Sequence, residues 1–189
     1  MADTPVAAAP YPRELERTVR LANDALVRLR PIRPDDAPRL IAAYSRLSER
    51  SAYQRFFTVM KRLPPDWAQV FATVDFRRRL AIVAERDTPT GSEIIGVGRY
   101  EPGDDDDTVE VAFVVEDGWQ GFGLGPMLLD AVLRAGEARG IQRFRAYVLA
   151  DNDRMLRLLA RYTDVVDRRL EDGVVALLFR SRPVTAASP

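Results

Sequence analysis

The most informative part of the chain is Val109-Glu-Val-Ala-Phe-Val-Val-Glu-Asp-Gly-Trp-Gln-Gly-Phe-Gly-Leu-Gly-Pro126, followed by Met127-Leu-Leu-Asp-Ala-Val-Leu-Arg-Ala. Its first seven residues are apolar except for Glu110, which is typical of a largely buried strand. The segment after Pro126 has apolar residues at helical spacing, and proline suits the first turn of a helix. A strand, a glycine-rich turn and a helix in this order predict an α/β domain with a ligand site at the turn.

The three alternate glycines of this turn, Gly121, Gly123 and Gly125, favour a phosphate-bearing ligand. Glycine lets the backbone approach a ligand closely, and the helix start points free N–H groups and a positive dipole end at it. The spacing excludes a dinucleotide fingerprint, because Pro126 or Leu128 would occupy the third glycine position. No lysine follows the turn, so it is not a P-loop. A glycine turn without any ligand stays open as the alternative.

Composition narrows the class of protein. The 189 residues are 47% hydrophobic, which is enough to form one core. The formal net charge is zero, so the composition does not indicate a nucleic-acid-binding protein. Cysteine and histidine are absent, which excludes disulfides, thiol nucleophiles, Ser-His-Asp triads and most transition-metal sites. No apolar run has membrane-spanning length and the start lacks signal-peptide features, so we expect a cytoplasmic protein without membrane association. Lys61 is the only lysine, and we interpret the excess of arginine as compositional bias.

The periodicity predicts a single mixed α/β domain, built on a mostly antiparallel central sheet flanked by helices. We expect an N-terminal extension over residues 1–24, disordered to about residue 12, then the domain over 25–181 and a tail over 182–189. We expect the solvated loop Asp104–Asp107 to bind no metal. Predicted helices cover Glu14–Asn23, 34–47, Ser48–Phe57, Pro65–Thr73, 126–139 and Asn152–Arg161. Predicted strands cover Leu26–Ile32, Arg79–Ala84, Glu93–Tyr100, Val109–Val115, Gln142–Leu149, Val165–Leu170 and Val174–Phe179.

Three stretches carry a resemblance to a known family. Gln120-Gly-Phe-Gly-Leu-Gly125 resembles the acyl-CoA pyrophosphate loop of the GNAT N-acetyltransferase superfamily, and the element order from about residue 25 to 180 is similar to its fold. Leu29-Arg-Pro-Ile-Arg-Pro-Asp-Asp-Ala37 and Leu47-Ser-Glu-Arg-Ser-Ala-Tyr-Gln-Arg-Phe-Phe57 look like the acetyltransferase domain of Pat-type protein lysine acetyltransferases. Val148–Leu159 is similar to the superfamily's next strand-to-helix junction, with Asn152 at the cleft.

The resemblance implies acetyl-CoA as acyl donor and no metal. The strand backbone at Phe113, Val114 and Val115 would pair with the pantetheine arm, and a bulge there would expose an N–H that stabilises the oxyanion. Asn152 suits both the cleft and a helix N-cap. The implied cofactor site comprises Phe113, Val114, Val115, Gln120, Gly121, Phe122, Gly123, Leu124, Gly125, Pro126 and Asn152.

The resemblance also implies that Glu110 is the general base. It is the one carboxylate inside the apolar strand, where partial burial would raise its pKa and improve it as a base. A solvated residue at the strand start is the alternative, and Glu116, better placed to cap the loop, is the second candidate. Leu159 stands where the family often has a tyrosine acid, and Tyr162 could substitute for it.

Three functions remain on sequence alone. The first is an acetyl-CoA-dependent acetyltransferase for lysine side chains of proteins, which the resemblance favours. The second is a GNAT enzyme for a small amine or a protein N-terminus, and the third is an acyl-CoA-binding regulatory domain without turnover. The acceptor, the acyl length and the oligomeric state, with a homodimer as one alternative, stay open.

Overall fold

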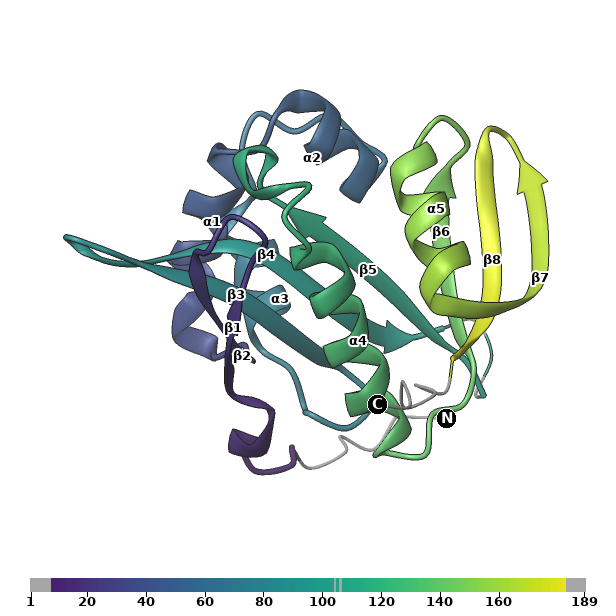
Figure 1. Cartoon of the computed structure of the whole chain (residues 1–189), viewed down its shortest axis with the longest axis horizontal. Helices are drawn as coiled ribbons and strands as arrows, with labels where there is room; N and C mark the ends of the chain where they lie inside the picture. Colours follow the sequence, from purple (N-terminus) through teal and green to yellow (C-terminus); the bar gives the residue numbers. More distant parts are fainter. Residues whose placement is uncertain (1–7, 104, 106, 183–189) are drawn as a thin grey trace.

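A computed structural model describes residues 8–103, 105 and 107–182. Its centre is an eight-stranded sheet with the strand order β1-β2-β3-β4-β5-β6-β8-β7 (Figure 1). All neighbouring strands are antiparallel except the parallel pair β5 and β6. The predicted mixed, mostly antiparallel sheet in a single domain is confirmed.

The elements alternate along the chain much as the periodicity predicts. The strands are β1 (Arg17–Arg20), β2 (Leu26–Pro31), β3 (Leu80–Thr88), β4 (Gly91–Pro102), β5 (Val109–Val115), β6 (Phe144–Leu149), β7 (Thr163–Glu171) and β8 (Val174–Ser181). The helices are α1 (Ala37–Ser45), α2 (Glu49–Phe56), α3 (Pro65–Ala72), α4 (Leu124–Glu137) and α5 (Asp153–Tyr162). Short 3₁₀ turns cover Arg13–Leu15 (η1), Pro34–Asp36 (η2) and Asp117–Trp119 (η3).

Helices cover both faces of the sheet (Figure 1). Helix α4 packs on β3, β4 and β5 and contacts α5, while α1 and α3 pack together on the opposite face. Each side has its own apolar core, one around Leu128 and Phe144 and the other around Tyr44 and Ile94. Since β3 is covered on both faces, Leu80 to Glu85 are all buried, and Leu80–Ala84 form a continuous apolar run rather than an alternating one.

The helix predicted over Glu14–Asn23 is wrong. Only the 3₁₀ turn η1 forms there, and β1 then pairs with β2 in an antiparallel hairpin. The β-branched Thr18 and Val19 favour a strand, and Asp24, with φ of 63°, closes the turn in a left-handed conformation that aspartate tolerates. The expected N-terminal extension therefore contains a strand of the sheet.

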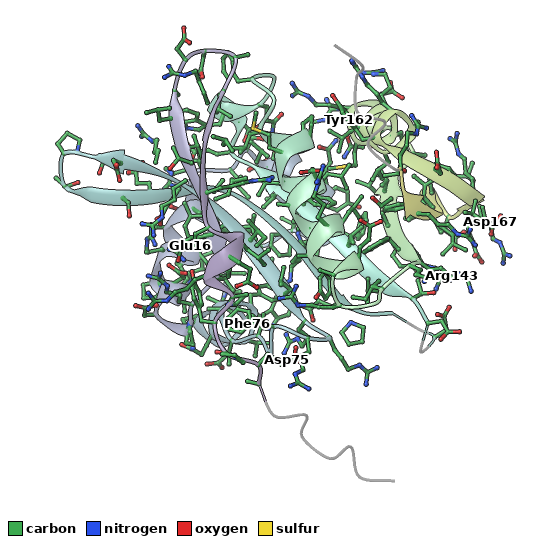
Figure 2. The ribbon with its side chains drawn as sticks, turned by 60° about the horizontal axis from the view of Figure 1, so that its bottom comes forward. Glu16, Asp75, Phe76, Arg143, Tyr162 and Asp167 are labelled. Carbon is green, nitrogen blue, oxygen red and sulfur yellow. The ribbon has the colours of Figure 1, made fainter. Side chains whose placement is uncertain are left out.

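The disorder predicted up to residue 12 is also wrong where the structure describes the chain. Ala9 N–H donates to the Asp75 carbonyl at 2.9 Å. The Tyr11 ring stands edge-on to Phe76, with 5.7 Å between ring centroids. Figure 2 shows Asp75 and Phe76 where this segment passes. The expectation for residues 1–7 lies outside the described residues.

Two other predicted segments lie partly outside the described residues, namely 104 and 106 of the aspartate loop and 183–189 of the tail. Asp105 accepts a hydrogen bond from Arg145 at 3.3 Å. Within the described ranges, no group of three or more His, Cys, Asp or Glu side chains could hold a metal ion. No helix in the same ranges is both long and apolar enough to cross a membrane.

A buried ion network joins β2, β3 and the start of α1. The Arg30 guanidinium donates to Asp36 at 2.7 and 2.8 Å and to Glu85 at 2.9 Å, and all three side chains are buried. Arg39 donates to the same two carboxylates at 2.7 and 2.8 Å. Burial alone would raise the pKa of Asp36, but the hydrogen bonds from Arg30 and the Arg33 backbone outweigh it and hold that pKa below its ordinary value.

We expect Asp36→Asn to lower the free energy of unfolding at pH 7 by about 3 kcal/mol, because it leaves Arg30 buried without one carboxylate. The folded pKa of Asp36 is lowered, so its contribution is fully present above an unfolded pKa of about 4 and is lost as pH falls through the folded value. Urea unfolding of both proteins between pH 7 and pH 3 should therefore show the difference shrinking in acid. Asp24→Asn, in an exposed pair with Arg20, is the control and should change little. A difference between Asp36→Asn and the parent that stays constant across this range would contradict the interpretation.

Candidate functional site

The site begins where β5 and β6 separate. Only Val109 and Glu110 on β5 pair with Phe144 and Arg145 on β6. Beyond these two pairs the strands diverge, as Figure 1 shows between β5 and the group formed by β6, α5 and β8. The edge of β5 from Val111 onward is therefore open on the β6 side.

A cleft of about 790 Å³ occupies this opening. Its walls come from β5, β6, α2, α5 and the glycine turn before α4. Nine of the predicted cofactor residues line it: Phe113, Val114, Val115, Gln120, Gly121, Gly123, Gly125, Pro126 and Asn152. Phe122 and Leu124 are not among the lining residues; the Leu124 side chain is buried in the core, and Phe122 packs partly buried against that core.

The amide directions along β5 place two donors in the cleft. Glu116 N–H donates to Ile95 on β4 at 2.9 Å, whereas Val109 N–H donates toward β6, to Arg143, at 3.3 Å. Because these directions alternate along a strand, the N–H groups of Phe113 and Val115 face the cleft. The bulge that the resemblance implies on this strand does not occur, because β5 keeps an unbroken register with β4. The divergence of β6 exposes these groups instead.

The glycine turn presents further donors at one end of the cleft. Gly121 and Gly123 have φ of 89° and 93°, which side-chain-bearing residues rarely adopt. Gly123 is the N-cap of α4, and Met127 N–H is the first to return to its carbonyl, at 3.4 Å. The preceding amides of Leu124 and Gly125 lack intrahelical partners, as at any helix start, and the helix dipole adds positive potential. This geometry suits an anion such as a pyrophosphate.

Gln120 ties the walls of the cleft together. Its side-chain amide donates to the Val115 carbonyl at 2.9 Å and to Ser51 on α2 at 3.3 Å. Its side-chain oxygen accepts from Arg154 on α5 at 2.6 Å. The carbonyl that β6 leaves unpaired is thus satisfied by Gln120, and α2, β5 and α5 meet at one residue.

Two carboxylates on the segment before Gln120 hold α2 and the residues that precede it. Asp117 accepts from the Ser48 backbone and hydroxyl at 2.9 and 2.7 Å and from Ser51 at 2.8 Å. Glu116 accepts from Arg46 at 2.9 Å. Burial alone would raise the pKa of Asp117, yet these hydrogen bonds hold it below its ordinary value. Glu116 is therefore engaged in anchoring the segment before α2.

Glu110 lies on the cleft wall, but its expected partial burial is wrong. The side chain is exposed and lines the cleft beside Ala112 and Arg55. Its strand position next to the β5–β6 divergence leaves it open to solvent.

Helix α5 turns different side chains toward the cleft from those that the sequence suggests. The Asn152 side chain caps α5 by accepting from Met155 N–H at 3.2 Å, and Asn152 also lines the cleft. Leu159, at the position of the family's tyrosine, is fully buried in the core and does not reach the cleft. Leu158 and Tyr162 face the cleft instead, and Tyr162 is 42% exposed.

Sequence reasoning missed the arginines around the cleft. Arg154, Arg157 and Arg161 line it from α5, and Arg55 lines it from α2. The signal was present, because positions 154, 157 and 161 are three and four residues apart and so share one helix face. Because the excess of arginine was attributed to compositional bias, this spacing was not interpreted as part of a site.

Comparisons with known proteins agree with this geometry. The acetyltransferase (GNAT) domain family matches residues 27–162. "Acetyltransferase Pat" of Mycolicibacterium smegmatis is 32% identical over 133 residues, which is 70% of this chain but 39% of that protein. The GNAT domain of S. lividans PAT superposes with a TM-score of 0.80 and 36% identity, covering 90% of this chain and 99% of that one. A cAMP-binding acyltransferase from Mycobacterium smegmatis gives a TM-score of 0.60 at 26% identity, covering 92% of this chain and 50% of that one.

We expect Gly123→Val to weaken acetyl-CoA binding by more than about tenfold, because a branched residue cannot hold the turn at φ of 93° without strain. Calorimetric titration of the purified chain measures this. Gly140→Val is a matched control, since Gly140 has φ of 83° and equally open space but lies after α4, away from the cleft. Equal affinity in Gly123→Val and the parent would remove the turn from the binding site.

Proposed function

Because this chain belongs to the GNAT acetyltransferase family, we propose that it transfers an acetyl group from acetyl-CoA directly to an amine held in the cleft. The chain spans 39% of the length of the Pat protein it matches, so the activity is argued from this domain's own residues. The single observation that carries the proposal is the shared cleft. It brings the amides of the glycine turn, the Phe113 N–H and the Glu110 carboxylate onto one continuous surface.

The residues fit an acyl-CoA. Bound acetyl-CoA would supply an activated thioester carbonyl. The glycine turn and the start of α4 would hold its pyrophosphate, with Arg154 and Arg157 as further cationic groups on the rim. The open edge of β5 would pair with the pantetheine arm, and the Phe113 N–H would donate to the carbonyl oxygen as negative charge develops there.

Glu110 is proposed to accept the proton of the acceptor amine. A lysine amine with a pKa of about 10.4 is only ~0.1% neutral near pH 7.4, which costs roughly 4 kcal/mol. The amine nitrogen then forms its bond to the carbonyl carbon while the carbon–sulfur bond to CoA breaks. Deprotonation of the amine is therefore the larger of the two proton-transfer costs, and a positioned base lowers it.

The leaving thiolate needs less help. A thiol with a pKa of about 8.5 lies near ambient pH, so its protonation contributes about 1.5 kcal/mol. Solvent or the Tyr162 hydroxyl can deliver this proton, since Tyr162 lines the exposed end of the cleft. Burial of Leu159 leaves no role for that position in proton transfer.

The acceptor is proposed to be a lysine side chain of a protein, and the site of action the cytoplasm. The resemblance to Pat-type enzymes at residues 29–37 and 47–57 supports this class, and the similarity to the Pat protein and to the GNAT domain of S. lividans PAT agrees with it. A small amine or a protein N-terminus is the competing acceptor class.

We expect Glu110→Gln to lower acetyl transfer at pH 7 by about 10²- to 10⁴-fold while acetyl-CoA affinity changes little. The amide keeps the shape of the side chain and removes the base. The loss should shrink as pH rises toward the pKa of the acceptor amine, because the neutral amine then needs no base. Initial rates of CoA release between pH 6.5 and 10, with a lysine-containing peptide, measure both effects.

Glu137→Gln, on an exposed turn at the end of α4, provides the control and should match the parent at every pH. If Glu110→Gln runs at the parental rate at pH 7, another group accepts the proton.

A further inference from the structure

Beside the α2 wall of the cleft lies a compact group of charges on α2, β4, β5 and the residue before β3. Glu101 on β4 lies directly opposite Glu110 on β5 in the antiparallel register. Like charges in such cross-strand positions repel, so this pair needs neighbouring cations. Three arginines, Arg55, Arg79 and Arg99, supply them.

Two of these arginines are committed to Glu101. Arg79 donates to it at 3.1 and 3.5 Å, and the buried Arg99 makes a short ion pair with it. Arg99 also lies over the Phe71 ring, with its guanidinium carbon 4.8 Å from the ring centroid. The Nε–H of Arg99 is buried and, among the described residues, has no hydrogen-bond partner.

Arg55 is left without a hydrogen-bonded anion. Its guanidinium lies 4.8 Å over the Phe56 ring and, within the described part of the chain, forms no hydrogen bond or salt bridge. Desolvation by burial and the charge of Arg99 lower the pKa of Arg55 to about 10, while Glu110 and Glu101 act in the opposite direction. The side chain still carries its charge at neutral pH.

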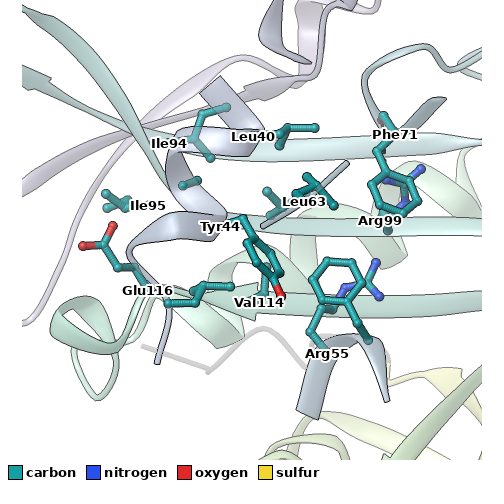
Figure 3. A pocket seen from close by; sticks show the side chains of 15 residues that line it. Leu40, Tyr44, Arg55, Leu63, Phe71, Ile94, Ile95, Arg99, Val114 and Glu116 are labelled. Carbon is teal, nitrogen blue, oxygen red and sulfur yellow. Dashed lines mark hydrogen bonds between the residues drawn. The ribbon is translucent and has the colours of Figure 1, made fainter. Parts of the chain in front are cut away.

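Arg55 stands between two spaces. It lines the main cleft beside Glu110, and it lines a small neighbouring cavity of about 50 Å³ together with Arg99 and Val114. Figure 3 shows the polar ends of this cavity, with Arg55 and Arg99 on one side and Glu116 on the other. The remaining walls are apolar, which strengthens any ion pair formed there.

We propose that Arg55 binds a carboxylate that the acceptor carries close to its reacting amine, so that the chain selects amines with a neighbouring acidic group. Three arginines face two glutamates here, and a carboxylate on the acceptor would balance the excess. The guanidinium can donate two parallel hydrogen bonds to such a group. This inference rests on the proposed acetyl transfer and names the acceptor chemistry that it favours.

The carboxylate could belong to a peptide side chain or to a free amino acid, and paired substrates distinguish the two. The peptide pair carries one lysine with either Glu or Gln as its neighbour. The small-molecule pair is Nα-acetyl-lysine and its amide. We expect the parent to prefer the acidic member of at least one pair by about ten- to a hundredfold in kcat/KM, the range of a charge-assisted hydrogen bond.

Arg55→Met should bring that preference close to one, and Arg55→Lys should keep part of it, because lysine retains the charge without the paired donors. Arg50→Met, on the exposed face of the same helix and outside the cleft, should keep the full preference. The inference fails if neither pair shows a preference, or if Arg55→Met retains it. It also fails if Arg55→Met changes only the choice between succinyl-CoA and acetyl-CoA, because the anion would then belong to the acyl group.

If the proposed acetyl transfer is wrong, no amine in either pair will be acetylated. Calorimetric binding of the same peptides to the CoA-saturated chain then tests the carboxylate site on its own. Tighter binding of the Glu peptide in the parent, lost in Arg55→Met, supports the carboxylate site, and equal binding overturns it.

Discussion

The parallel contact between β5 and β6 ends after two residue pairs, and the rest of the site depends on that early separation. A strand edge inside a domain normally finds a partner, because unpaired amides and carbonyls are costly when buried. Here the gap stays open to solvent, and the Gln120 side chain takes up the Val115 carbonyl. The Phe113 N–H remains available at the centre of the cleft. A bound pantetheine arm, which carries its own amides, would therefore complete the sheet.

The separation also explains why the flanking helices are tethered so firmly. Since β6 no longer supports the far end of β5, α2 and α5 define the walls of the cleft. Asp117 holds the first turn of α2 through Ser48 and Ser51, and Arg154 connects α5 to Gln120. These bonds converge on residues 116–120, immediately before the glycine turn. The ligand loop and both walls are consequently positioned by one short segment.

The sequence predicted the parts of the molecule that follow from local pattern. The apolar run of β5, the glycine turn and the spacing of α4 are all encoded within one segment, so the fold class and most of the cleft could be inferred. The helix predicted near the N-terminus was wrong because Arg17–Arg20 forms a strand by pairing with β2, and the spacing of apolar residues does not reveal this contact. Glu110 is exposed and Leu159 points into the core because of how β6 and α5 pack. Composition and periodicity do not determine this packing. The arginines of α5 have a readable helical spacing, but their importance appears only when the helix is placed beside the turn.

A crystal structure of the chain with acetyl-CoA tests the central claim most directly. We expect the pantetheine arm to lie between β5 and β6, with the thioester oxygen within hydrogen-bonding distance of the Phe113 N–H and the pyrophosphate at residues 121–125. Acetyl-CoA bound outside this cleft, or a thioester oxygen that points away from β5, would contradict the proposed site.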